Sequence, residues 1–159
     1  MLPRPSRAVL AGTFLRDARR LALSIRGRLF TRSKPLEPAL LVSRSVDDIE
    51  RALGERHFEP NWDMSFAYFG EVLNLRRVEY VGDRHSKFDW WQVHVRGYHH
   101  PDGVELTAHF ETDPSEYPDA HVERVGIDID RGLETLTSAL EDANVEFRSM
   151  TPAEVAALD

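Results

Sequence analysis

The sequence contains no cysteine and only two lysines, and each scarcity restricts what the protein can do. Without cysteine there are no disulfides and no thiolate nucleophile, and a zinc site would have to consist of histidine and carboxylate ligands. The other eighteen basic residues are arginine, against twenty-seven acidic residues. An acidic, lysine-poor composition is typical of proteins from salt-loving archaea; a GC-rich genome, which favours arginine codons, is the alternative explanation.

Long apolar runs and recognisable catalytic motifs are also missing. Arg16, Asp17 and Arg19 interrupt the N-terminal apolar stretch, so no run of 18 apolar residues predicts a transmembrane helix. The run Ala8–Leu15 is too short for a secretory signal. Gly-x-Ser-x-Gly, His-Glu-x-x-His, EF-hand and glycine-rich phosphate-loop motifs are absent. No reaction is indicated, so we do not expect an enzyme.

Charge divides the chain into two unlike parts. Residues 1–44 carry ten basic and two acidic residues, a net charge of +8, whereas the remainder has a net charge of −15. This division predicts a basic arm at residues 1–38 and an acidic domain at residues 39–159. At molar salt the Debye length is only about 3 Å, so charge alone would then attract a distant partner weakly.

The arm has the pattern of an amphipathic helix over residues 6–32, with prolines on both sides. Three environments remain open for its apolar face: the protein's own core, a membrane surface or a protein partner. Nucleic acid is unlikely as a partner, since interleaved aromatic residues are lacking. We expect partner or membrane contact at Phe14, Arg16, Arg19, Arg20, Leu21, Ile25 and Arg26. The leading hypothesis is a non-enzymatic binding or adaptor domain, cytoplasmic and peripheral at the membrane where the partner is lipid.

The acidic part predicts an α+β fold: an antiparallel four- to five-stranded sheet (meander) with helices packed on one face, preceded by the basic amphipathic N-terminal helix. A helix is expected at 46–53 and another from Asp130 as its N-cap to about 143, with a terminal helical turn capped by Thr151. The main strands expected are 61–70, 72–81, 90–98, 104–112 and 122–129, and the segments 39–43 and 145–147 are candidates for additional short strands.

The alternation of apolar residues fixes the register of the hairpin formed by strands 90–98 and 104–112. Pairing His99 with Val104 keeps all apolar side chains on one face and places His94 opposite His109. The other face carries Trp90, Arg96 and Tyr98. Because a solvated face seldom carries tryptophan, we expect either another segment to cover this face or a binding surface for a ligand.

The same face contains the best candidate metal ligands. His94 and His109 would lie directly opposite each other, with Glu111 two residues further along the strand. Two imidazoles and a carboxylate at this spacing suit Zn²⁺, Fe²⁺ or Mn²⁺. The alternative interpretation is an ordinary polar outer face. A small-molecule or divalent-metal site, catalytic or not, is therefore the second hypothesis, and no other cofactor is expected.

Overall fold

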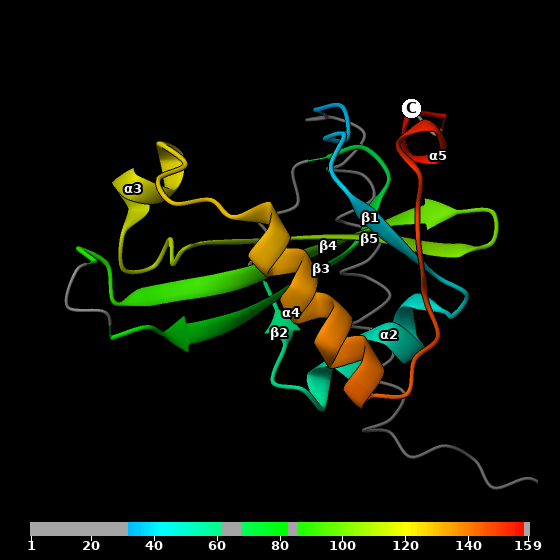
Figure 1. Ribbon diagram of the computed structural model, residues 1–159, viewed down its shortest axis with the longest axis horizontal. Helices are drawn as coiled ribbons and strands as arrows, with labels where there is room; N and C mark the ends of the chain where they lie inside the picture. The colour runs from blue at the N-terminus through cyan, green and yellow to red at the C-terminus, as the bar shows by residue number, and fades with distance from the viewer. Residues whose placement is uncertain (1–31, 62–67, 83–85, 158–159) are drawn as a thin grey trace, which may run out of the picture.

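A computed structural model describes residues 32–61, 68–82 and 86–157 (Figure 1). The strands form one antiparallel sheet in the order β2-β3-β4-β5-β1-β6. The strands are β1 (Ala39–Val42), β2 (Glu59–Pro60), β3 (Glu71–Tyr80), β4 (Trp90–His100), β5 (Gly103–Thr112) and β6 (Arg148–Ser149). The helices are α2 (Val46–Gly54), α3 (Pro118–Val122), α4 (Ile129–Asp142) and α5 (Pro152–Ala156). The predicted α+β class is confirmed, with six strands in place of four to five.

The predicted register of the central hairpin is confirmed. His99 pairs with Val104, and His94 pairs with His109. The hairpin contains one further pair, His100 with Gly103, so that only Pro101 and Asp102 form the turn. β2, β3, β4 and β5 follow one another as a meander, and β1 returns to pair with the free edge of β5. The alternation of side chains thus gives the sheet one apolar and one polar face.

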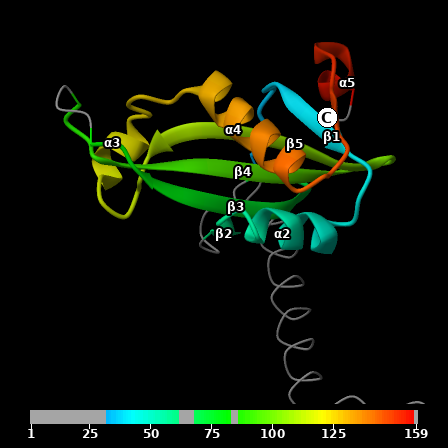
Figure 2. The same ribbon diagram turned by 60° about the horizontal axis from the view of Figure 1, so that its bottom comes forward.

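Helices α2 and α4 lie on the apolar face of the sheet (Figure 2). Ser45 caps α2 through the backbone N–H of Asp48, as expected. The N-cap of α4 is Asp128, two residues before the predicted Asp130, because the Asp128 carboxylate accepts the backbone N–H of Arg131. The helices contribute Ile49, Leu53, Leu136, Ala139 and Leu140 to the core, against Leu73, Leu75, Val93, Val95, Val104, Leu106, Ala108 and Phe110 of the sheet.

The strand predicted at 122–129 is wrong. Residues 118–122 form α3, with Pro118 at its start, and only Asp128 reaches the sheet, in an isolated bridge to Phe110. Positive φ angles at Arg124 and Gly126 break the extended path between them. The valines that suggested a strand are exposed, Val122 to 79% and Val125 to 38%.

The C-terminal segment joins the other edge of the sheet. The strand predicted at 145–147 is shifted along the chain and occurs as β6. Val145 and Phe147 pack against the core, and pairing with β1 starts only after them. Thr151 caps α5 in a full capping box with Glu154, as expected. Of the strand predicted at 61–70, residues 62–67 lie outside the described ranges. None of the described helices has the length and apolar character needed to cross a bilayer.

The central part of the polar face is buried, whereas Trp90, the residue that suggested a covered face, is 40% exposed at the end of this face. Residues 34–37 cover part of this face, since Lys34 contacts Glu105 and Glu37 contacts His109. Asn61 reaches it beyond β2, and His121 reaches it from α3. The polar side chains of this face therefore lie in a poorly solvated environment, where charges and hydrogen bonds must be matched.

Candidate metal centre

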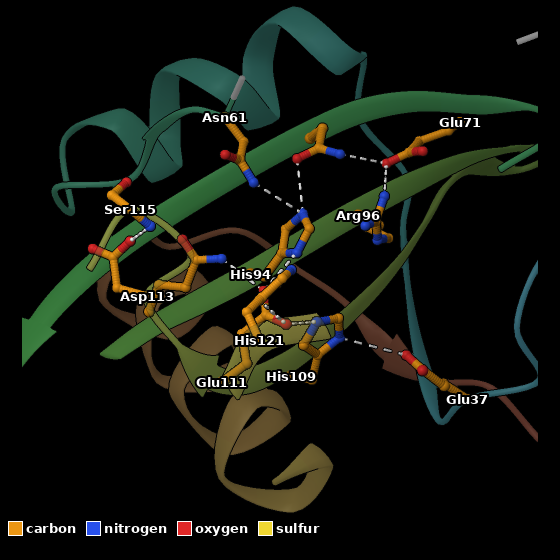
Figure 3. A network of polar contacts seen from close by, with 12 residues as sticks. Glu37, Asn61, Glu71, His94, Arg96, His109, Glu111, Asp113, Ser115 and His121 are labelled. Carbon is orange, nitrogen blue, oxygen red and sulfur yellow. Dashed lines mark hydrogen bonds and ion pairs between the residues drawn. The ribbon is translucent and has the colours of Figure 1, made fainter. Parts of the chain in front are cut away.

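The polar face brings His94, His109 and Glu111 together (Figure 3). The two imidazole rings have centroids 5.1 Å apart and planes inclined at 70°. One nitrogen of each ring and one carboxylate oxygen of Glu111 all lie within 4.8 Å of one another. The residues are 2%, 9% and 3% exposed, respectively. The strand pairing that places them also holds them rigidly.

Glu111 is the centre of this cluster. Its Oε1 lies 3.0 Å from His94 Nδ1 and accepts a 2.6 Å hydrogen bond from the Gln92 side-chain amide. Its Oε2 lies 3.2 Å from His109 Nε2. Burial by itself raises the pKa of Glu111, but the hydrogen bonds with His109 and His94 outweigh it and hold that pKa well below its usual range. A buried carboxylate anion thus faces two imidazole nitrogens.

The outer nitrogen of each imidazole faces an oxygen acceptor. His94 Nε2 lies 2.8 Å from Asn74 Oδ1, and His109 Nδ1 lies 3.8 Å from Glu37 Oε2. Metal-ligating histidines usually donate their outer N–H to a carbonyl or carboxylate, which fixes the tautomer and directs the other lone pair at the ion. The surroundings of His94 fit this pattern at hydrogen-bond distance, whereas the contact of His109 with Glu37 is an ion pair beyond that distance.

The side chain of Asn74 is oriented by Glu71. The Asn74 amide nitrogen donates a 2.6 Å hydrogen bond to Glu71 Oε1, so its oxygen faces His94. Arg96 Nη1 donates to the same carboxylate oxygen at 2.5 Å. A β-bulge between Glu71 and Leu73 turns Glu71 onto the polar face, where it lies opposite Tyr98. Without the bulge Glu71 would share the apolar side of Leu73.

His94 cannot satisfy its neighbours as a neutral imidazole. Burial, followed by the charge of Arg96, lowers the pKa of His94 to about 3, so the ring has one N–H at neutral pH. Both Glu111 Oε1 and Asn74 Oδ1 are acceptors, and either tautomer leaves a nitrogen lone pair facing one of them. The side-chain amide nitrogen of Asn61, Nδ2, lies 3.2 Å from His94 Nε2 and can donate to it only when Nε2 has no proton. In that tautomer the Nε2 lone pair also faces the Asn74 oxygen. A cation between His94 Nδ1 and Glu111 would let the Nε2–H donate to Asn74 Oδ1, and the Asn61 amide would then have to turn its Nδ2 away from the ring.

His109 has the opposite titration behaviour. Burial lowers its pKa, but the neighbouring carboxylates of Glu111 and Glu37 raise it further, to about 9. In the metal-free protein at neutral pH the ring is therefore an imidazolium between two carboxylates. A metal ion would replace its Nε2 proton.

Of the residues predicted as a ligand face, Arg96 and Tyr98 lie two residues apart on the same face of β4, and Trp90 lies away from them. Arg96 and Tyr98 are buried, with the Arg96 guanidinium 4.8 Å from the Tyr68 ring centroid and Lys34 5.6 Å from the Tyr98 ring centroid. Trp90 is 40% exposed at the far end of β4, where it stacks edge-to-face on Tyr80. The expected contact residues of the arm, Phe14, Arg16, Arg19, Arg20, Leu21, Ile25 and Arg26, lie outside the described residues.

Sequence reasoning missed several members of the cluster. His121 lies in α3, and its Nδ1 is 3.3 Å from Glu111 Oε2. Asn74 and Glu71 come from β3, and Glu37 comes from the segment assigned to the arm. The available signal was the concentration of five histidines between positions 94 and 121, which includes His121.

Comparison with known proteins finds no family model, no curated protein and no solved structure that matches this chain.

Proposed function

We propose that this protein binds a divalent transition-metal ion through His94, His109 and Glu111. One observation supports this proposal above the others. Both imidazoles present an inner nitrogen to the Glu111 carboxylate while the outer nitrogen faces an acceptor, Asn74 Oδ1 for His94 and Glu37 Oε2 for His109. This arrangement is expected of two ligand histidines with their supporting residues.

The spacing of the ligand atoms suits an ion of this size. Zinc binds imidazole nitrogen and carboxylate oxygen at about 2.0–2.2 Å, which separates ligand atoms by about 3.3 Å in tetrahedral geometry. His94 Nδ1 lies 3.0 Å from Glu111 Oε1 and His109 Nε2 lies 3.2 Å from Glu111 Oε2, so each imidazole contacts a different carboxylate oxygen. One ion bound to all three residues would draw their ligand atoms closer together than the 4.8 Å within which they lie. Neutral imidazoles, Glu111 and the nearby Glu37 would together balance its two charges.

The ligand types indicate the class of metal. Two nitrogens and one carboxylate oxygen favour Zn²⁺, Fe²⁺ or Mn²⁺, whereas Mg²⁺ and Ca²⁺ favour all-oxygen sites. A catalytic metal also needs an open coordination position for water or substrate. The ligands here are at most 9% exposed. This burial supports ion binding over the turnover of a large substrate, and we propose a binding protein in place of an enzyme.

Calorimetric titration of metal-free, full-length protein with ZnCl₂ and with MgCl₂ tests the proposal. We expect one Zn²⁺ per chain with micromolar or tighter affinity and no comparable binding of Mg²⁺. Glu111→Gln, which keeps the side-chain shape, and His94→Ala should each weaken Zn²⁺ binding by about tenfold or more. His99→Ala is the matched control, because His99 lies on the same strand with an exposed side chain. Absence of Zn²⁺ binding by the wild type, or an equal loss in the control, would contradict the proposal.

A second function is supported by the division of charge between residues 1–44 and the rest of the chain. We propose that the arginine-rich arm binds an anionic membrane surface or an acidic protein partner. Its apolar residues would supply affinity where salt screens the arginines.

Co-sedimentation of full-length protein with phosphatidylglycerol vesicles, at low and molar salt, tests the membrane form of this proposal. Replacing Arg16, Arg19, Arg20 and Arg26 by alanine should reduce binding at low salt, and Leu21→Ser should reduce it under both conditions. The Zn²⁺ titration serves as the control for an intact domain. Unchanged sedimentation of both variants would exclude the arm as the membrane contact.

A further inference from the structure

We infer that His121 is the fourth protein ligand of the proposed ion, so that α3 closes the site. This inference depends on the proposed metal function. It adds a fourth ligand and a coordination number, and it implies that the bound metal holds α3 against the sheet. The ligand set becomes three histidines and one glutamate, which leaves no position for substrate in a four-coordinate ion.

The fold holds His121 over Glu111. The segment 113–128 leaves the sheet at the end of β5 and returns at Asp128, which exchanges two backbone hydrogen bonds with Phe110. Within it, the backbone N–H groups of Ser115 and Tyr117 donate to Asp113 and start the turn that leads into α3. His121 Nδ1 then lies 3.3 Å from Glu111 Oε2, the oxygen that also faces His109 (Figure 3).

The Nδ1 atom of His121 has no hydrogen-bond partner among the described residues, although it is buried. Its distance to Glu111 Oε2 is within ion-pair range, but the orientation is not that of a hydrogen bond. A buried polar atom that makes no hydrogen bond destabilises the fold. A metal ion bound to Glu111 would give the nitrogen lone pair a partner by a small rotation of the side chain.

The helix that carries His121 has little else to hold it. α3 spans five residues and buries none of them, and Val122 is 79% exposed. So short a helix is not stable by itself. Besides the turn at Asp113, it is anchored by Tyr117, whose ring contacts Phe88 edge-to-face at 5.0 Å and whose hydroxyl accepts the Asp89 N–H. The inferred bond from His121 to the ion would therefore fix α3 to the sheet, and removal of the metal would release it.

A direct test uses the absence of cysteine from the natural sequence. Full-length His121→Cys protein, metal-free and reduced, is titrated with Co²⁺ and followed by absorption spectroscopy. A thiolate bound to Co²⁺ produces a near-ultraviolet charge-transfer band that histidine and glutamate ligands do not produce. We expect this band in His121→Cys with one Co²⁺ per chain. His99→Cys is the control and should bind Co²⁺ without the band, because its exposed side chain lies outside the site.

Two further measurements separate ligation from a structural role. His121→Ala should weaken Co²⁺ binding by about tenfold or more and reduce the visible absorption of four-coordinate Co²⁺. Hydrogen exchange of residues 113–128 should slow on Zn²⁺ binding in the wild type and remain unchanged in His121→Ala.

The outcomes distinguish this inference from the function on which it depends. If the wild type binds no Zn²⁺ or Co²⁺, the proposed function fails and the inference fails with it. If the wild type binds Co²⁺ and Glu111→Gln does not, the proposed function stands. In that case, a missing charge-transfer band in His121→Cys, with unchanged affinity in His121→Ala, overturns the assignment of His121 alone.

Discussion

The proton on His109 competes with the proposed ion for one nitrogen. Because the neighbouring carboxylates of Glu111 and Glu37 raise the pKa of His109 to about 9, metal binding at neutral pH must displace this proton. Zn²⁺ affinity should therefore rise by about tenfold per pH unit up to pH 9 and level off above it. Calorimetry in buffers of different ionisation enthalpy should show about one proton released by His109 per ion at pH 7. A count near zero would contradict this assignment of the His109 proton.

His109 also makes the stability of the metal-free protein depend on pH. Its pKa is raised in the folded state from 6.5 to about 9, so its contribution is complete below pH 6.5 and is lost as pH rises through 9. The stability difference between wild type and His109→Gln should thus be larger at pH 6 than at pH 9.5, by about 3 kcal/mol. Urea unfolding in the presence of a chelator measures both values. A difference that grows with pH would show that the ring is neutral in the fold.

Some residues of the candidate site were predictable from the sequence and others were not. The shared face of His94, His109 and Glu111 was predictable, because side chains alternate along a strand and the hairpin has a single favoured register. Both features depend on the local alternation of apolar residues. His121 approaches Glu111 through a loop whose path depends on positive φ angles at Arg124 and Gly126, which the sequence pattern did not reveal. Tertiary contacts between distant segments decided which polar side chains completed the cluster.

At the scale of the elements, the packing of α4 against β5 supports the site from behind. The backbone of Gly132 lies so close to the backbone of His109 that a Cβ atom there would overlap it. Gly132→Ala should therefore destabilise the protein by about 1–3 kcal/mol, although alanine is the better helix former. Gly54→Ala in α2 is the matched control, since nothing lies within 4 Å of its Cβ position, and should cost nothing. Thermal unfolding of both variants checks this; equal midpoints would disprove the close approach.

The elements also show why sequence patterns succeed in one place and fail in another. β4 and β5 alternate regularly and are paired along their whole length, so local pattern and tertiary structure agree. The segment 122–129 has the residue types of a strand, and β1 leaves the edge of β5 beyond Thr107 free for it. Positive φ angles at Arg124 and Gly126 nevertheless limit the described pairing of this segment to one bridge, at Phe110. The bulge that turns Glu71 onto the polar face likewise has no signature in the residue alternation.

At the scale of the whole molecule, Lys34 connects three distant segments. Its ammonium group contacts both carboxylate oxygens of Glu105, at 2.9 and 3.0 Å, and donates to the Val155 carbonyl in α5 at 3.3 Å. Glu105 is fully buried. One of the two lysines of the chain thus lies inside the protein, where salt screens its ion pair far less than a surface pair.

The Lys34 ion pair tests the predicted division into an arm, 1–38, and a domain, 39–159. Lys34→Met leaves Glu105 buried without its cation and should cost about 3–5 kcal/mol; adding Glu105→Leu should restore most of this loss. A chain starting at residue 39 lacks Lys34 and Glu37 and should be less stable, by a similar amount, than a chain starting at residue 32. Urea unfolding at low and molar salt measures these differences, which should persist at high salt because the pair is buried. Equal midpoints for the two truncated chains would mean that residues 32–38 belong to an independent arm, as the charge division predicts. A loss confined to the shorter chain would move the domain boundary to the N-terminal side of Lys34.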